Sequence, residues 1–142
     1  MRDYESLSHV KWECKYHVVW IPKYRRKSLY GQIRRRFGQI LRELCRQKGI
    51  ELLEGHAMSD HVHICVSIPP KYSISYVAGF LKGKSAIRLN KEFSSKMRGS
   101  KSFWARGYFV STVGLDEHVV RQYINQQEEQ DKRQMEIEFG HI

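Results

Sequence analysis

Two histidines near the middle of the chain, His61 and His63, are the residues whose spacing most directly suggests chemistry. Successive side chains of a β-strand point to opposite faces, so a strand here would place both imidazoles on one face, about 7 Å apart. The other face would be filled by Val62, Ile64 and Val66. Two such imidazoles can converge on one metal ion. The pair alone is a weak signal, because histidines on strands are more often surface or core residues than ligands.

Cys65 is the next residue on the same face and would allow a zinc site in principle. It lies a further distance of about 7 Å along the strand, and the sequence offers no evident fourth ligand. The three cysteines of the chain are also widely spaced, without a Cys-x-x-Cys pair. These features argue against both a thiolate zinc site and a disulfide framework.

Tyr123 and Gln127 form a second pair, because positions i and i+4 share one face of a helix. A tyrosine that merely covers the sheet is the simpler interpretation, but it leaves the polar amide of Gln127 beside a packing face without a partner. If the helix docks over the histidine face, Gln127 supplies a third ligand and Tyr123 places its hydroxyl next to the ion. Two imidazoles and an amide oxygen form an open site that suits Mg²⁺ or Mn²⁺.

Such a site would make a weak nucleophile useful. A phenol with a pKa near 10 is a poor nucleophile at neutral pH, and a DNA phosphodiester repels it once it is ionised. A divalent ion polarises the scissile phosphate and neutralises developing negative charge. The product would be a covalent phosphotyrosine, and a free hydroxyl on another strand end could attack it. Cleavage followed by joining is recombination without added ATP.

The hydrophobic pattern predicts the elements that must position these residues. Strands are expected at 10–20, 50–58, 61–68 and 103–113, and helices at 31–48, 74–91 and 117–131. Ser73 or Ser75 is expected to cap the second helix, and Asp116 the third. Residues 94–102 are expected to form a mobile loop and residues 132–142 a polar tail.

This order of elements predicts an α+β fold of the ferredoxin-like (RRM-like) βαββαβ type, with an additional C-terminal helix that carries Tyr123. Two helices would cover one face of an antiparallel sheet, and the other face would need a cover or a ligand. The length, 142 residues, suits one compact domain that spans residues 1–142.

The formal net charge of +10 predicts a polyanionic partner. Residues 1–49 hold 13 basic and 4 acidic side chains, and residues 68–108 hold 9 and 1, so the basic surface is segregated from an acidic C-terminal segment. A basic cluster with an aromatic ring can grip phosphates while the ring stacks on a base. The candidate DNA-binding residues are Lys23, Tyr24, Arg25, Arg26, Lys82, Lys84 and Arg106. A plain solvated surface is the alternative interpretation.

Membrane and secretory functions are not predicted. The chain has no apolar run near the roughly 20 residues that a membrane span needs, and its first residues lack the apolar core of a signal peptide. A cytoplasmic location is therefore expected.

Together, these motifs resemble the TnpA-type insertion-sequence transposases of the HUH (His-hydrophobic-His) one-tyrosine class, which mobilise DNA as single strands. The resemblance covers nearly the whole chain. It is carried by residues 15–26 (KYHVVWIPKYRR), 60–63 (DHVH), 68–71 (IPPK), Tyr76 with 80–85 (FLKGKS), 103–108 (FWARGY) and 123–127 (YINQQ). Ser59 is a departure, because many relatives have proline before the aspartate.

The resemblance implies that His61 and His63 bind the metal, that Tyr123 is the nucleophile and that Gln127 is the third ligand. It also implies a homodimer joined through the sheets, in which the tyrosine helix of one subunit can complete the histidine site of the other. The substrates would be single-stranded DNA hairpins at element ends, and cleavage would leave a 5′-phosphotyrosine and a 3′-hydroxyl.

Two other functions compete with transposition. One is a host-retained relative, or a replication-type HUH nickase, acting on repeated palindromes; such nickases usually have a third histidine near the pair, and His56 is the nearest candidate. The other is a non-catalytic nucleic-acid-binding module like RNA-recognition domains. Those domains stack bases on aromatic residues of their central strands, and the strand at 61–68 has none.

Overall fold

The computed structural model describes residues 5–7, 10–93, 103–114 and 116–139, and within these ranges it contains ten elements. The strands are β1 (Glu5–Leu7), β2 (Val10–Trp12), β3 (Lys15–Trp20), β4 (Glu51–Met58), β5 (His61–Ser67) and β6 (Phe109–Ser111). The helices are a 3₁₀ turn η1 (Lys23–Arg25), α1 (Gly31–Gln47), α2 (Ile74–Glu92) and α4 (Glu117–Phe139).

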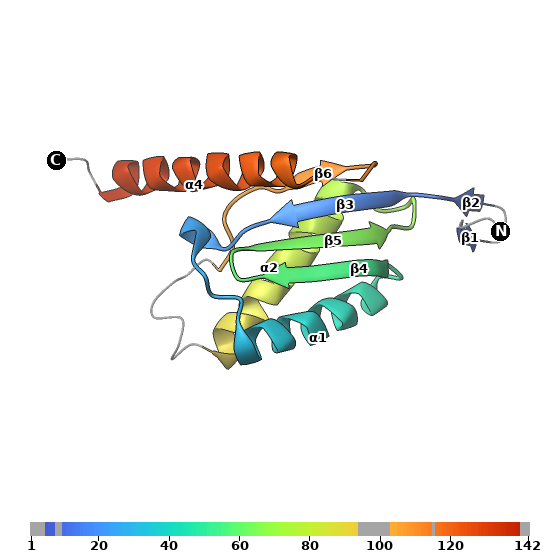
Figure 1. Ribbon diagram of the computed structural model, residues 1–142. Coiled ribbons are helices and arrows are strands. Elements are labelled where there is room, and N and C mark those ends of the chain that lie inside the picture. Colours follow the sequence, from blue (N-terminus) through green and yellow to red (C-terminus); the bar gives the residue numbers. More distant parts are fainter. Residues whose placement is uncertain (1–4, 8–9, 94–102, 115, 140–142) are drawn as a thin grey trace.

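The main sheet has four strands in the order β4-β5-β3-β6, and every pairing is antiparallel (Figure 1). With β3, α1, β4, β5, α2 and β6 in chain order, this is the ferredoxin-like arrangement, and α4 follows it as the additional C-terminal helix. The predicted fold class is confirmed. β1 and β2 form a separate two-stranded sheet.

Helices α1 and α2 cover one face of the sheet because each presents an apolar stripe at helical spacing. From α1 the buried residues include Ile33, Phe37, Ile40, Leu41 and Leu44. They pack with the sheet residues Val18, Trp20, Val62, Ile64 and Val66. Ser73 caps α2, since its Oγ accepts a hydrogen bond from the Tyr76 backbone N–H at 3.0 Å.

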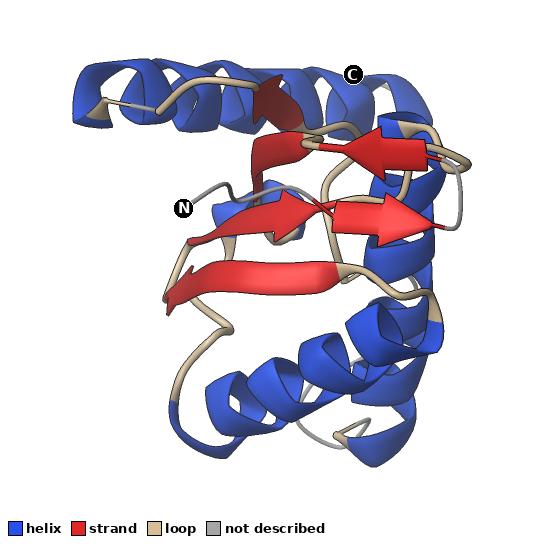
Figure 2. Cartoon of the chain, turned by 90° about the vertical axis from the view of Figure 1, so that its right-hand side faces the viewer, coloured by secondary structure: helices blue, strands red, loops and turns tan. Residues whose placement is uncertain are grey.

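Helix α4 packs on the other face of the sheet. Val120 and Ile124 of α4 form a second apolar cluster with Val19 and Ile21, which point away from the main core, and with Ala105. Figure 2 shows α4 at the top of the view and α1 at the bottom, with the strands between them. The end of β3 is therefore buried on both faces, with Val18, Val19 and Trp20 at most 2% exposed. Asp116 caps α4, with its Oδ1 2.9 Å from the Val119 backbone N.

Two predicted strands were too long. The segment 10–20 is divided because residues 10–12 pair with β1, whereas pairing with β5 begins at Lys15. Only Phe109–Ser111 of the segment 103–113 forms a strand. Trp104 instead packs edge-on against Trp20 and donates from Nε1 to Ser85 Oγ at 3.0 Å, and Gly107 turns the chain at φ 81°.

The last helix was predicted too short. It extends to Phe139, so most of the predicted polar tail is helical. Asp131, the last residue of the predicted helix, is only 3% exposed. The predicted loop at 94–102 lies outside the described residues.

Candidate active site

His61 and His63 lie on the face of β5 that is turned away from the main core. Burial alternates along the first residues of β5, with the two histidines half-buried and Val62 and Ile64 fully buried on the opposite side. The pairing register places His63 beside Val19 of β3 and beside His56 of β4. The histidine pair therefore shares its face with the apolar cluster that α4 covers.

Asp60 orients the first histidine. Its Oδ1 lies 3.0 Å from His61 Nδ1, and its Oδ2 accepts from Arg25 Nε at 3.1 Å. Burial raises the pKa of Asp60, but the bonds to His61 and Arg25 outweigh it, so the pKa lies below its ordinary value. With Nδ1 held by an ionised carboxylate, His61 Nε2 is the nitrogen that stays available to a metal ion, as in the carboxylate–histidine pairs of metal sites.

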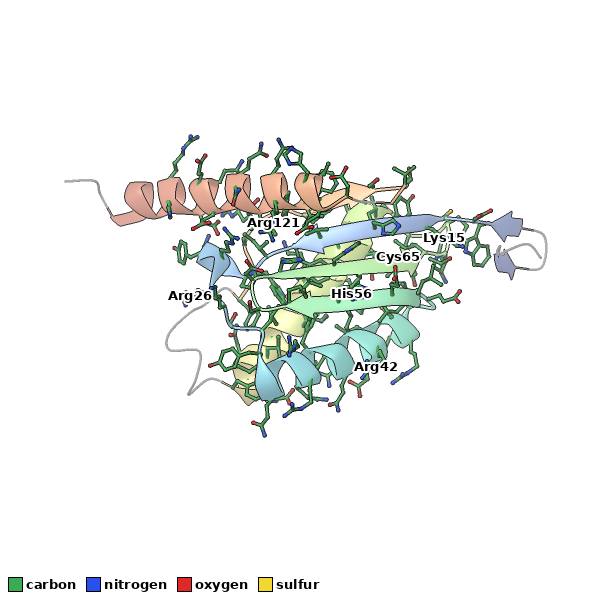
Figure 3. The ribbon with its side chains drawn as sticks, viewed as in Figure 1. Lys15, Arg26, Arg42, His56, Cys65 and Arg121 are labelled. Carbon is green, nitrogen blue, oxygen red and sulfur yellow. The ribbon has the colours of Figure 1, made fainter. Side chains whose placement is uncertain are left out.

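His63 lies in a cluster of histidines. His17 Nδ1 is 3.3 Å from His63 Nε2, and the rings of His56 and His63 are 6.1 Å apart. Burial lowers the pKa of His63, and the neighbouring charges of His17 and His56 lower it further. The neutral imidazole that a metal ligand must be is therefore favoured. Figure 3 labels His56 and Cys65 on the strands of this face.

Sequence reasoning did not identify His17 as a neighbour of the pair. Its position on the odd face of β3, two residues before Val19, is the signal that could have placed it there. The cross-strand register, which sets His17 opposite Cys65, was needed to bring it next to His63. The Cys65 sulfur lies 3.9 Å from His17 Nε2.

A cavity of about 650 Å³ opens between the histidine pair and α4. Its walls come from β5, from the β4–β5 turn, from the first turns of α4 and from Arg34 of α1. The lining residues are Arg34, Met58, Ser59, Asp60, His61, His63, Asp116, Glu117, Val120, Arg121 and Ile124. A space of this size is sufficient for a nucleotide-sized ligand.

Tyr123 and Gln127 do not line this cavity. The Tyr123 ring packs against Phe109 at 5.9 Å, and its hydroxyl is buried with no hydrogen-bond partner among the described residues. Gln127 is 8% exposed, with its Oε1 beside Gly107. Helix α4 thus covers the histidine face as expected, but within one chain it turns Val120 and Ile124, rather than the tyrosine, toward the cavity.

The histidine pair has suitable donors for a metal ion, but the full predicted ligand set is not together in one chain. His61 is oriented by Asp60 and His63 is disposed to be neutral, so both fit a metal site. Within the part of the chain that the structure describes, no group of three or more His, Cys, Asp or Glu side chains is arranged to hold an ion.

Asp131 is a buried carboxylate that connects α4 to η1. It accepts a hydrogen bond from the Tyr24 backbone N–H at 2.8 Å, and Lys23 Nζ lies 3.6 Å from its other oxygen.

Burial raises the pKa of Tyr123, and the charge of Asp131 raises it further. Both effects favour the protonated form of the Tyr123 phenol.

Three of the predicted DNA-binding residues already have partners in the protein. Arg25 donates to Asp60 and to Glu128, and Lys23 pairs with Asp131. Lys82 donates to the carbonyls of Ala105 and Gly107 at 2.8 and 2.6 Å, and burial lowers its pKa to about 8. Each of these three residues therefore has a structural contact within the chain.

The other predicted DNA-binding residues remain accessible. Arg26, Lys84 and Arg106 are exposed, and Tyr24 is half-buried. Lys23 and Arg26 lie over the Tyr24 ring, 5.2 and 5.5 Å from its centroid. A surface that offers cations and a ring to a nucleic acid is thus present at η1.

Comparisons with known proteins agree along nearly the whole chain. A family model described as "Transposase IS200 like" matches residues 10–127. The transposase for insertion sequence element IS200 of Salmonella typhimurium is 47% identical over 135 residues, covering 93% of this chain and 88% of the relative. The ISDra2 transposase TnpA of Deinococcus radiodurans is 30% identical over 124 residues, covering 84% and 88%.

Two solved structures share the fold. A putative transposase from Deinococcus radiodurans superposes with a TM-score of 0.75 at 29% identity, covering 87% of this chain and 96% of that one. A REP-associated tyrosine transposase bound to a REP hairpin gives 0.54 at 11% identity, covering 97% and 76%. In the described residues, every helix is too short or too polar to cross a membrane.

Proposed function

Because the chain belongs to the family of IS200-like transposases, we propose that it cleaves and rejoins single-stranded DNA at the ends of an insertion sequence. The observation that carries this proposal is the pair His61 and His63, oriented at one end by Asp60 and facing a cavity large enough for a nucleotide. Hairpins near the element ends are the proposed recognition elements, and the cytoplasm is the proposed location.

His61 and His63 would hold a divalent ion, Mg²⁺ or Mn²⁺, with Gln127 as the proposed third ligand. When bound, the ion polarises the scissile phosphate and neutralises its developing charge. Asp60 keeps the proton of His61 on Nδ1 and so presents Nε2. Val120 and Ile124 form the apolar part of the cavity wall while α4 is docked on its own chain.

Tyr123 is the proposed nucleophile. Its phenol oxygen forms a bond to phosphorus and its proton leaves to solvent, while the bond from phosphorus to the 3′ oxygen breaks and that oxygen takes up a proton. The products are a 5′-phosphotyrosine and a free 3′-hydroxyl. In the reverse reaction, a 3′-hydroxyl attacks the phosphotyrosine, restores a phosphodiester and releases the phenol.

The position of Tyr123 supports a site completed by a second subunit. Its hydroxyl is buried and its ring packs against Phe109, outside the lining of the cavity that the histidine pair shares, so the proposed reaction requires α4 to be redocked. A homodimer in which α4 of one subunit lies over the histidine pair of the other would bring Tyr123 and Gln127 to the ion.

Strand cleavage is tested with single strands from each flank of the gene, chosen for subterminal palindromes and labelled at one end. With Mg²⁺, we expect a 3′ label to migrate with the protein on a denaturing gel, and a 5′ label to be released on a shorter strand. EDTA should abolish both products. Attachment of the 5′-labelled fragment would contradict the proposed polarity. Metal-independent hairpin binding without cleavage would favour a non-catalytic binding module.

The salt dependence of DNA binding should distinguish the exposed cations from Lys82, which is bound to two backbone carbonyls. Each phosphate contact that is lost removes counterion release, so Arg26→Ala, Lys84→Ala and Arg106→Ala should each reduce the slope of log K against log salt by roughly 1. Lys82→Met is the matched control, because the Lys82 ammonium is bound to two carbonyls, and its slope should stay at the wild-type value. Fluorescence anisotropy with a labelled hairpin measures the slope. If all three variants at exposed positions kept the wild-type slope, the DNA would have to bind to another face of the protein.

A further inference from the structure

Arg34 is a cation in the wall of the histidine cavity that neither the fold nor the proposed nucleophile uses. It lies in the first turn of α1, is exposed, and lines the same cavity as His61 and His63. The Arg34 backbone N–H bonds to the Tyr30 carbonyl in the first turn of the helix, which leaves the guanidinium uninvolved in holding that turn.

The other charged groups of the wall already have partners. Asp60 is bonded to His61 and to Arg25. Arg121 pairs with Glu117 at 3.2 Å, and the carboxylate of Asp116 caps α4. Among the described residues no carboxylate forms an ion pair with Arg34, whereas Arg36, two residues later on the same helix, is bound to Glu92.

Arg34 is thus the guanidinium of the cavity wall that has no carboxylate partner among the described residues, whereas Arg121 of the same wall is paired with Glu117. A guanidinium presents a planar fork of donors that matches two oxygens of a phosphate, and it stays charged at every physiological pH. The cavity holds space for a nucleotide between that fork and the histidine pair.

We propose that Arg34 is a further catalytic residue, which binds the non-bridging oxygens of the scissile phosphodiester beside His61 and His63. This assignment rests on the proposed function. The charge on those oxygens grows as the phenol attacks, so a donor aimed at them stabilises the transition state more than the bound substrate. Because Arg34 comes from α1, its position does not depend on which subunit provides Tyr123.

Single-turnover cleavage by Arg34→Ala at saturating DNA is the test. Loss of one donor to a developing oxyanion typically slows a reaction by about 100-fold, and we expect a loss of that order with hairpin affinity changed less than roughly threefold. Arg34→Lys should recover part of the rate, since it restores the charge without the fork. Arg35→Ala is the matched control, because Arg35 is exposed on the same helix but lines a separate hollow with Arg36 and Glu92.

A substrate with a neutral methylphosphonate at the scissile position identifies the group that Arg34 contacts. The wild-type chain should lose most of its cleavage rate on this substrate. The rate of Arg34→Ala on the same substrate should then be nearly equal to the wild-type rate. A wild-type rate for Arg34→Ala, or an equal defect of this variant on both substrates, would overturn the assignment. A wild-type chain that cleaves no single strand would overturn the proposed function and this assignment with it.

Discussion

Mixing two inactive variants is expected to restore strand cleavage. Tyr123→Phe removes the phenol oxygen but keeps the histidine pair, and the double variant His61→Ala, His63→Ala keeps the phenol but removes the pair. In a dimer whose helices are exchanged, each mixed dimer contains one complete site. Random pairing makes half of the dimers mixed, so the mixture should reach about a quarter of the wild-type rate.

This result follows from where the structure places Tyr123. The Tyr123 ring packs against Phe109 and its hydroxyl is buried, whereas Val120 and Ile124 line the chain's own cavity. Each variant alone should give no covalent adduct in the labelled-strand assay. The two proteins must be mixed under conditions that allow subunits to exchange, with wild type and Tyr123→Phe mixed as the control. An inactive mixture in which mixed dimers are demonstrated would mean that α4 redocks over the histidines of its own chain.

The sequence predicted the histidine site better than the orientation of the tyrosine helix. On a strand the side-chain period is two, so once β5 was recognised, His61 and His63 had to share the face opposite Val62 and Ile64. The antiparallel order of strands followed from the order of elements, because few topologies satisfy the rules of chain connection. The contact between His17 and His63 depended on register, which no local pattern specifies.

Helix α4 was harder to predict because polar residues continue its buried stripe. Val120, Ile124, Gln127 and Asp131 follow one another at helical spacing and are all at most 9% exposed. The apolar part of this stripe ends at Ile124, so an apolar pattern alone does not predict the burial of Asp131. A polar residue that continues an apolar stripe is expected to be buried and to have a hydrogen-bond or ion-pair partner. The partners of Asp131 are Lys23 and Tyr24, more than a hundred positions away in the sequence.

Asp131→Asn is therefore expected to destabilise the protein by about 2–4 kcal/mol, the usual result of breaking a buried charged contact. The amide can still accept from the Tyr24 N–H, but Lys23 loses its counterion and the half-buried Lys82 loses the nearby negative charge that favours its ammonium form. Urea unfolding measures the change. Glu129→Gln is the matched control, since Glu129 is exposed on the same helix, and its free energy of unfolding should stay within about 0.5 kcal/mol of wild type.

The same substitution should also affect the histidine pair, because a series of contacts connects Asp131 to His61 through η1 and Asp60. Asp131 holds η1 through its ion pair with Lys23, which the substitution removes, and through the Tyr24 N–H, which the amide can still bind. In η1, Tyr24 and Arg25 have φ values of 60° and 52°, a left-handed backbone that costs roughly 1–3 kcal/mol for each residue. Arg25 in turn holds Asp60, and Asp60 orients His61. Once η1 relaxes, Asp131→Asn should need more Mg²⁺ for half-maximal cleavage than Glu129→Gln, at a temperature where both are folded. Equal metal requirements would show that Arg25 keeps Asp60 in place without help from α4.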